Sequence, residues 1–175
     1  MKKTLLGILA LIFLSGVGYG QKVRIGVVNP DYILANSKEG KKILSELQAL
    51  QKRKEAEIAR RQKEIQSLQR KLQTQQGVMS SQAVQRLQEK IIEKQKALKR
   101  YVDDAKDELA RANQKKLGAF QQKMLKVIRK VAKAKGLVVV LDKRQVIFSD
   151  PVIDISSEVI GELDRMFDKQ VGIGK

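Results

Sequence analysis

The sequence of 175 residues contains no cysteine, no histidine and no tryptophan, and it has only two prolines. Without cysteine, the stability of the protein cannot depend on disulfides, and thiolate nucleophiles are excluded. Without histidine, the usual proton shuttle of enzymes near neutral pH is missing, together with the commonest metal ligand. We therefore predict a protein that is not an enzyme and that uses no cofactor or metal.

The remaining patterns that could support catalysis have plainer explanations. The glycines of residues 172–174 lack the preceding strand and following helix that a dinucleotide-binding loop requires. The acidic residues between 103 and 108 stand beside Lys106 and Arg111 in a predicted helix, so solvated surface charge explains them better than a catalytic or metal-binding pair.

The first twenty residues have the pattern of a secretory signal peptide. Two lysines at positions 2 and 3 precede an apolar run from 5 to 14, and small residues follow at 18–20. The apolar run is too short for a transmembrane helix, although an uncleaved membrane anchor is the alternative. Because no cysteine follows, a lipid attachment site is excluded. We expect a cleaved leader and a mature protein that is soluble outside the cytoplasm.

A proline-free stretch of about a hundred residues, 37–135, dominates the mature chain. Apolar residues recur in it every three or four positions, which predicts two helices joined along a hydrophobic seam. The break at 76–81 contains Gly77 and two serines, a glycine to end the first helix and a serine to cap the second. An antiparallel hairpin folded at this tip pairs Leu72 with Leu87 and Leu68 with Ile91. An ordinary coiled-coil spacer is the alternative interpretation of this arm.

Two short flanks, 22–36 and 136–170, form a discontinuous body in this prediction. We expect a strand at 23–29 and a short helical turn at 31–34, then strands at 137–141 and 146–148 and a last helix at 158–169. These elements are too few for an independent core, and oligomerisation is a common way to complete one. We predict a β-structure shared between subunits, with Val27, Val139, Leu141 and Ile147 at the interface.

The positive charge is concentrated in the arm. Residues 38–135 contain 27 basic and 11 acidic residues, a net charge of +16 out of +17 for the chain, whereas residues 136–175 have a net charge of −2. Such an excess predicts an anionic partner, and outside the cytoplasm the candidates are acidic client proteins, anionic lipid headgroups or lipopolysaccharide. A basic face that is merely solvated is the plainer alternative. The candidate client-binding residues are Val78, Met79, Lys90, Lys94, Lys96 and Arg100.

Non-specific nucleic-acid binding is a competing hypothesis from another class, because the sequence pI is about 10.1. The export signal argues against it, as do the scarce aromatic residues and the spread of basic residues along the arm. A structural spacer between components of the cell envelope is a third hypothesis. An assay of protein aggregation separates these hypotheses from client binding.

The chain resembles the Skp (OmpH-like) family of periplasmic chaperones. The resemblance is carried by the leader, the opening strand with Tyr32-Ile33-Leu34 after it, and the Lys- and Gln-rich hairpin. Its most specific parts are AKGLVVVLD at 134–142 and DPVIDIS at 150–156; Asn29 stands where the family usually has Asp. The resemblance implies an α+β, jellyfish-like homotrimer, in which a small intersubunit β-barrel carries three antiparallel coiled-coil hairpins. It also implies an ATP-independent holdase that shields unfolded outer-membrane proteins in the periplasm.

Overall fold

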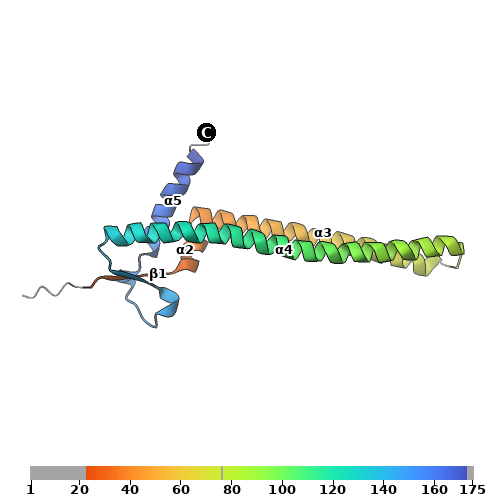
Figure 1. The fold of residues 1–175 in the computed structure, drawn as a ribbon, viewed down its shortest axis with the longest axis horizontal. Helices are drawn as coiled ribbons and strands as arrows, with labels where there is room; N and C mark the ends of the chain where they lie inside the picture. The colour runs from red at the N-terminus through yellow and green to blue at the C-terminus, as the bar shows by residue number, and fades with distance from the viewer. Residues whose placement is uncertain (1–22, 76, 173–175) are drawn as a thin grey trace, which may run out of the picture.

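The computed structural model describes residues 23–75 and 77–172, so the predicted signal peptide lies outside the described residues. A short strand and a short helix precede two long helices, and a second strand and a final helix follow them (Figure 1). The helices and strands are β1 (Ile25–Val28), α2 (Pro30–Asn36), α3 (Lys38–Gln75), α4 (Ser81–Ala134), β2 (Val139–Asp142) and α5 (Ser156–Gly172). Two 3-10 turns, η2 (Lys143–Gln145) and η3 (Pro151–Ile153), lie between β2 and α5.

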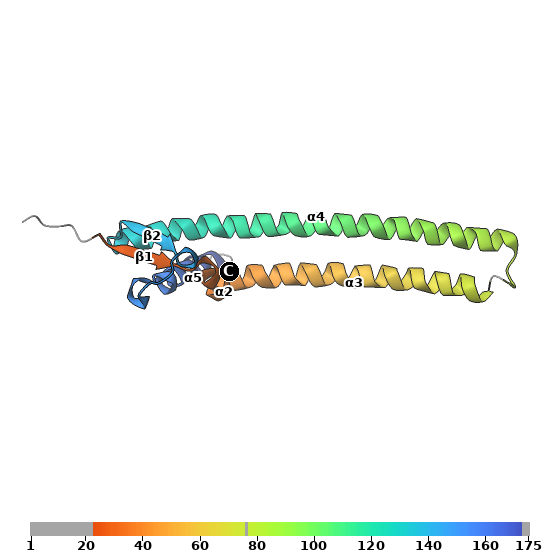
Figure 2. The ribbon, with the colours of Figure 1, turned by 90° about the horizontal axis from the view of Figure 1, so that it is seen from below.

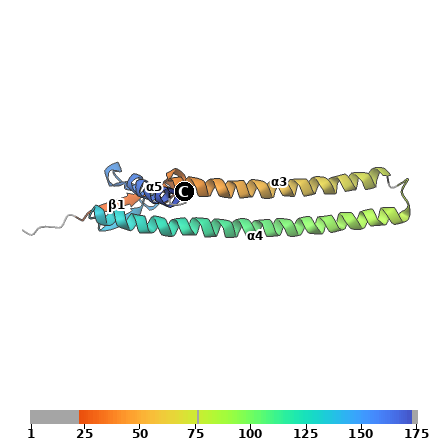
Figure 3. The same ribbon diagram turned by 90° about the horizontal axis from the view of Figure 1, so that it is seen from above.

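Helices α3 and α4 run side by side as a long hairpin, which we call the arm (Figures 2 and 3). They contain 38 and 54 residues, so they are about 57 and 81 Å long at 1.5 Å per residue. The predicted serine cap of the second helix is confirmed, because the Ser80 side chain accepts a hydrogen bond from the Ala83 N–H. Gly136, with φ of 64°, ends the run of helix as expected.

Ion pairs across the arm fix the antiparallel register of α3 and α4. Lys94 pairs with Glu64, and nearer the body Lys116 pairs with Glu46 and Lys123 with Glu39. The residue numbers of each pair add up to 158 or 162, close to the value of about 159 that the sequence predicted. The predicted hairpin register is therefore confirmed.

The two strands are parallel, with Ile25 opposite Val139 and Val28 opposite Asp142. Parallel strands need a long crossover connection, and here the whole arm is that connection. The predicted hairpin between 137–141 and 146–148 is wrong. The chain turns through η2 directly after β2, and residues 146–148 form no strand. Ile147 and Phe148 are consequently exposed, at 106% and 83% of their reference areas.

The core lies where the arm meets the body, a region that we call the root. Helix α5 packs across α2 and the root ends of α3 and α4, and it leaves the arm at a steep angle (Figure 1). The expectation that strands and a short helix alone supply the core is wrong, because α4 provides a large share of the buried residues. The main core cluster contains Val28, Ile33, Ile43, Phe120, Met124, Val127, Ile128, Ile155, Val159 and Leu163.

Candidate functional site

The arm is held together by a hydrophobic seam in its distal half. Ile65, Leu87 and Ile91 are buried there, and partly buried neighbours complete the cluster: Leu68, Leu72, Met79 and Leu98. These are the apolar residues that the three- and four-residue spacing placed on facing sides of two helices. The seam is only one side chain wide, so every other face of both helices is open to solvent and to a partner.

Polar residues interrupt the seam in the middle of the arm, and each finds a partner. The ring of Tyr101 lies between two cations, with the Arg61 guanidinium 4.4 Å and the Lys54 Nζ 5.6 Å from its centroid. The Lys54 Nζ also donates to a Glu108 carboxylate oxygen at 2.6 Å. Cations over an aromatic face stabilise the contact electrostatically. The interruptions that looked like flaws in the sequence are thus a polar joint between α3 and α4.

Glu57 accepts hydrogen bonds from two arginines one helical turn away. The Arg60 guanidinium donates to both of its carboxylate oxygens, at 2.7 and 2.8 Å, and the Arg61 Nε donates at 2.7 Å. The hydrogen bond from Arg60 is the main reason that the pKa of Glu57 falls from its usual 4.5 to about 2. Cross-arm hydrogen bonds from Lys116 and Lys94 lower the pKa values of Glu46 and Glu64 in the same direction.

These lowered pKa values predict how the stability of the arm depends on pH. The unfolded chain takes up protons at Glu57 first, so this contribution to stability is complete above about pH 4.5 and is lost as the pH falls toward about 2. We expect a Tm that is constant from pH 7 to about pH 5 and then falls. Thermal unfolding followed by circular dichroism measures it. Glu57→Gln should flatten part of the fall, and an unchanged pH profile in that variant would contradict the assignment.

Exposed cations dominate the distal arm. Between Glu64 and Glu89 the sequence has three basic residues and no acidic one. Farther along α4, the candidate residues Lys90, Lys96 and Arg100 are exposed, and none of the three forms an ion pair within the described residues. Lys94 differs from them, because its Nζ lies 2.6 Å from Glu64 and part of its charge is neutralised. The structure thus separates three free cations from a fourth that holds the arm together.

The two apolar candidates at the tip also differ from each other. Val78 is 89% exposed, whereas Met79 is half-buried and packs against the seam cluster. A shallow hollow of about 310 Å³ next to Met79 is bordered by Lys71, Arg86 and Lys90. Of the two tip residues, only Val78 presents most of its side chain to solvent.

At the root, acidic residues of α5 neutralise cations of the arm. Lys38 pairs with Asp168 at 2.6 Å, Lys135 pairs with Glu158 at 2.5 Å, and Lys130 pairs with Glu162. The Lys42 Nζ lies over the Phe167 ring, 5.9 Å from its centroid. The excess positive charge of the arm therefore faces outward along its length and is partly balanced where the arm meets the body.

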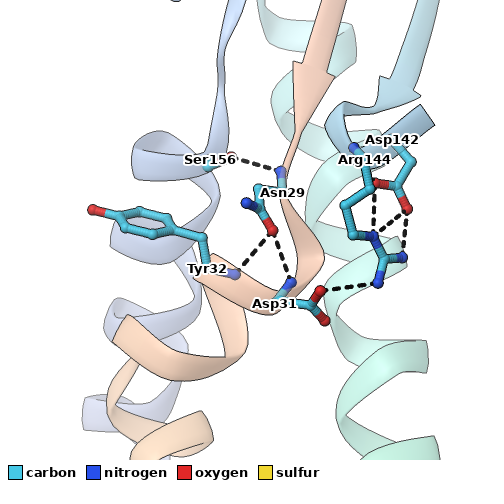
Figure 4. A network of polar contacts seen from close by, with 6 residues as sticks. All are labelled: Asn29, Asp31, Tyr32, Asp142, Arg144 and Ser156. Atoms are coloured by element: carbon cyan, nitrogen blue, oxygen red, sulfur yellow. Dashed lines mark hydrogen bonds and ion pairs between the residues drawn. The ribbon is translucent and has the colours of Figure 1, made fainter. Parts of the chain in front are cut away.

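A polar network joins the end of β1 to the starts of α2 and α5 (Figure 4). The Asn29 side-chain oxygen accepts from the N–H groups of Asp31 and Tyr32, both at 3.1 Å, and so caps α2. The Asn29 N–H donates to the buried Ser156 hydroxyl at 2.9 Å. A cap needs only an acceptor oxygen, so Asn serves here as well as the Asp that the family usually has.

Arg144 extends this network to the end of β2 (Figure 4). Its guanidinium lies 2.6 Å from the Asp142 carboxylate and 3.0 Å from that of Asp31. The hydrogen bond from Arg144 lowers the pKa of Asp142 below its ordinary value. Sequence reasoning assigned Arg144 only to a turn, because nothing in the sequence indicates that residues 31 and 144 meet.

The predicted interface residues occupy two different environments. Val27 is only 1% exposed and packs inside its own chain, so its side chain is not free for a partner. Val139, Leu141 and Ile147 are all exposed. Their role in an interface stays a prediction.

A membrane-spanning role finds no support in the described residues, where no helix is both long and apolar enough to cross a bilayer. The same residues hold no cluster of three or more side chains suited to bind a metal.

Comparison with known proteins places the chain among its relatives. The model of a family described as Outer membrane protein (OmpH-like) matches residues 24–163, which include the arm and nearly all of the body. The chain belongs to the OmpH-like family. A solved structure of a candidate outer membrane chaperone (OmpH-like) from Caulobacter crescentus superposes with a TM-score of 0.74 at 20% identity, covering 81% of this chain and 84% of the other. At that identity the likeness shows the fold alone. No curated protein matched.

Membership of the OmpH-like family confirms the resemblance that the two chain ends indicated. It supports a chaperone role and, at the level of the family, a protein that is not an enzyme. The finer questions of mechanism, clients and assembly are matters for a proposal.

Proposed function

We propose that this OmpH-like protein is an ATP-independent periplasmic holdase, which binds unfolded outer-membrane proteins between the basic arms of a homotrimer and prevents their aggregation. The observation that carries the proposal is the distribution of charge. Carboxylates at the root and in the middle of the arm pair with neighbouring cations, whereas Lys90, Lys96 and Arg100 point into solvent without a partner among the described residues. Such a surface attracts an acidic chain along its whole length.

Weak individual contacts suit a holdase, because a client must also be released. An exposed ion pair contributes only about 0.2–1 kcal/mol. Three arms around one client hold many such contacts at a high local concentration, so the total affinity exceeds that of any single arm. Apolar residues exposed along the arm, such as Ile92 and Val78, add small contacts to the apolar segments of an unfolded chain.

The body provides the surface for the proposed trimer. The outer edge of β2 has no strand beside it among the described residues, and Val138, Val139 and Leu141 are exposed there. An apolar edge strand that is neither charged nor covered is prone to pair with another chain. A β-barrel shared between three subunits would cover this edge and would direct the arms to one side of the body.

The decisive test dilutes an unfolded outer-membrane β-barrel protein out of denaturant in the absence of ATP and follows light scattering. We expect aggregation to be suppressed at about one trimer per client. A protein that fails to suppress scattering, while it binds DNA tightly at physiological salt, would favour the nucleic-acid hypothesis. Binding to vesicles of anionic lipid or to lipopolysaccharide, tested in parallel, shows whether the free cations also serve those partners.

Charge reversal on the arm should weaken client capture. For the double variant Lys90→Glu and Lys96→Glu we expect roughly tenfold weaker capture at low salt and a smaller dependence on salt, because six cations are reversed per trimer. Fluorescence anisotropy of a labelled unfolded client measures both. The variant Arg165→Glu and Lys169→Glu carries the same change of net charge on α5 and should capture clients as the parent does. Equal losses in the two variants would show that net charge alone matters.

A further inference from the structure

The described residues include one apolar segment that packs against nothing. Val146, Ile147 and Phe148 follow η2, and we call them the 146–148 segment. Ile147 is exposed at 106% of its reference area and Phe148 at 83%. Both belong to residue types that favour extended, half-buried structure, yet no strand of the described chain accepts them. Exposed aromatic and β-branched residues next to each other mark an interaction site.

The root holds a groove of matching character. A cavity of about 460 Å³ lies between α2, α4 and β2, and we call it the root groove. Pockets that hold ligands in proteins measure roughly 300–1,000 Å³, so this volume suits two large side chains. The floor is apolar and the only charged residues in the lining are Asp31, Asp142 and Arg144, which pair with one another at the rim. Its apolar lining includes Leu34, Leu117, Phe120, Met124, Leu125 and Val140.

The 146–148 segment does not fill the root groove of its own chain. None of its three residues lines the groove, although Arg144, two positions before it, does. The ion pairs of Arg144 with Asp31 and Asp142 fix the η2 turn at the rim, and the chain leaves the groove from there. The segment and the groove are therefore two separate surfaces of one body. Each is apolar, and neither is covered by the described residues.

We propose that the 146–148 segment of one copy inserts into the root groove of the next copy. The inference rests on the proposed oligomer and deepens it, because it names the residues through which the copies join. The segment carries no charge and so suits an apolar floor whose rim charges are already paired. Because segment and groove differ, the contact is head-to-tail, and such contacts build a closed ring when the rotation closes. A ring of this kind would leave each arm at an equivalent position around one axis.

Single substitutions test each side of the contact. We expect Phe148→Asp to remove the inserted side chain and Leu125→Glu to block the groove, and each variant alone to sediment as a monomer. Both positions are exposed in the single chain, so the fold should survive, and circular dichroism verifies the helix content. Ile147→Asp is a second variant of the segment. The matched controls are Val78→Asp at the tip and Ile92→Glu on α4, which are exposed apolar positions away from both surfaces and should leave the assembly intact.

A mixing experiment separates a head-to-tail contact from every symmetric one. Phe148→Asp keeps an intact groove and Leu125→Glu keeps an intact segment, so an equimolar mixture has exactly one working contact per pair. We expect a 1:1 heterodimer in sedimentation velocity from two monomeric variants. A mixture that stays monomeric overturns the inference. So does a Phe148→Asp or a Leu125→Glu variant that keeps the parent mass, including one that loses client capture instead, which would make the groove a client site.

The parent protein tells the two proposals apart. A parent that is monomeric at every concentration would sink the proposed trimer, and this inference with it. An oligomeric parent whose segment and groove variants keep its mass would sink only the inference.

Discussion

Gly40→Ala should lower the stability of the folded chain by about 1–3 kcal/mol, the usual cost of forcing a methyl group into a packed site. A Cβ at this position would lie 1.9 Å from the Leu34 carbonyl oxygen and 2.8 Å from the Ser37 Oγ. The clash cannot be relieved by rotating a side chain, because the Leu34 carbonyl belongs to the backbone of α2. Helix α2 would have to move away from α3, and the buried Ser37 hydroxyl would lose its hydrogen bond from the Gly40 N–H.

Thermal unfolding measures this loss, which corresponds to a fall in Tm of roughly 2–12 °C for a chain of this size. Gly118→Ala is the matched control, because a Cβ at that position of α4 meets nothing within 4 Å. Replacing glycine by alanine in an open helical position should raise stability by about 0.4–1 kcal/mol. The two variants should thus move Tm in opposite directions at equal protein concentration. A shift of the same sign in both would contradict the close approach of α2 to α3.

Leu163→Ala should be at least as damaging, at about 2–5 kcal/mol. Leu163 is completely buried, and its helix packs against α2 and both root ends of the arm. Removing most of its side chain leaves a cavity at the point where three helices meet. Chemical denaturation monitored by circular dichroism gives the free energy of unfolding directly. Because α5 ties α3 to α4 at the root, we also expect faster hydrogen exchange in the first turns of α3.

Val171→Ala on the same helix is the control for this prediction. Val171 is exposed, so its truncation should change the free energy of unfolding by less than about 0.5 kcal/mol. If Leu163→Ala proved equally mild, α5 would not be the element that anchors the arm. The proposed function would then lose its fixed root, since arms that splay independently cannot enclose a client.

The sequence by itself determined the arm. The spacing of Leu68, Leu72, Leu87 and Ile91 contains the seam, the tip and the register, because a helical hairpin depends on contacts that repeat every three or four residues. The cap at Ser80 and the left-handed Gly136 are local as well. The concentration of positive charge needs only counting along the chain.

Only the tertiary structure decided the root. Whether 146–148 pairs as a strand, whether Arg144 meets Asp31, and whether Lys94 is free or bound to Glu64 all depend on residues that are distant in sequence. The predicted hairpin failed for that reason: a short apolar run favours a strand, but it forms one only where a neighbouring edge is within reach. Local patterns fix helices because the partners lie within one turn, whereas strands, grooves and ion pairs across the root depend on how the ends of a long chain come together.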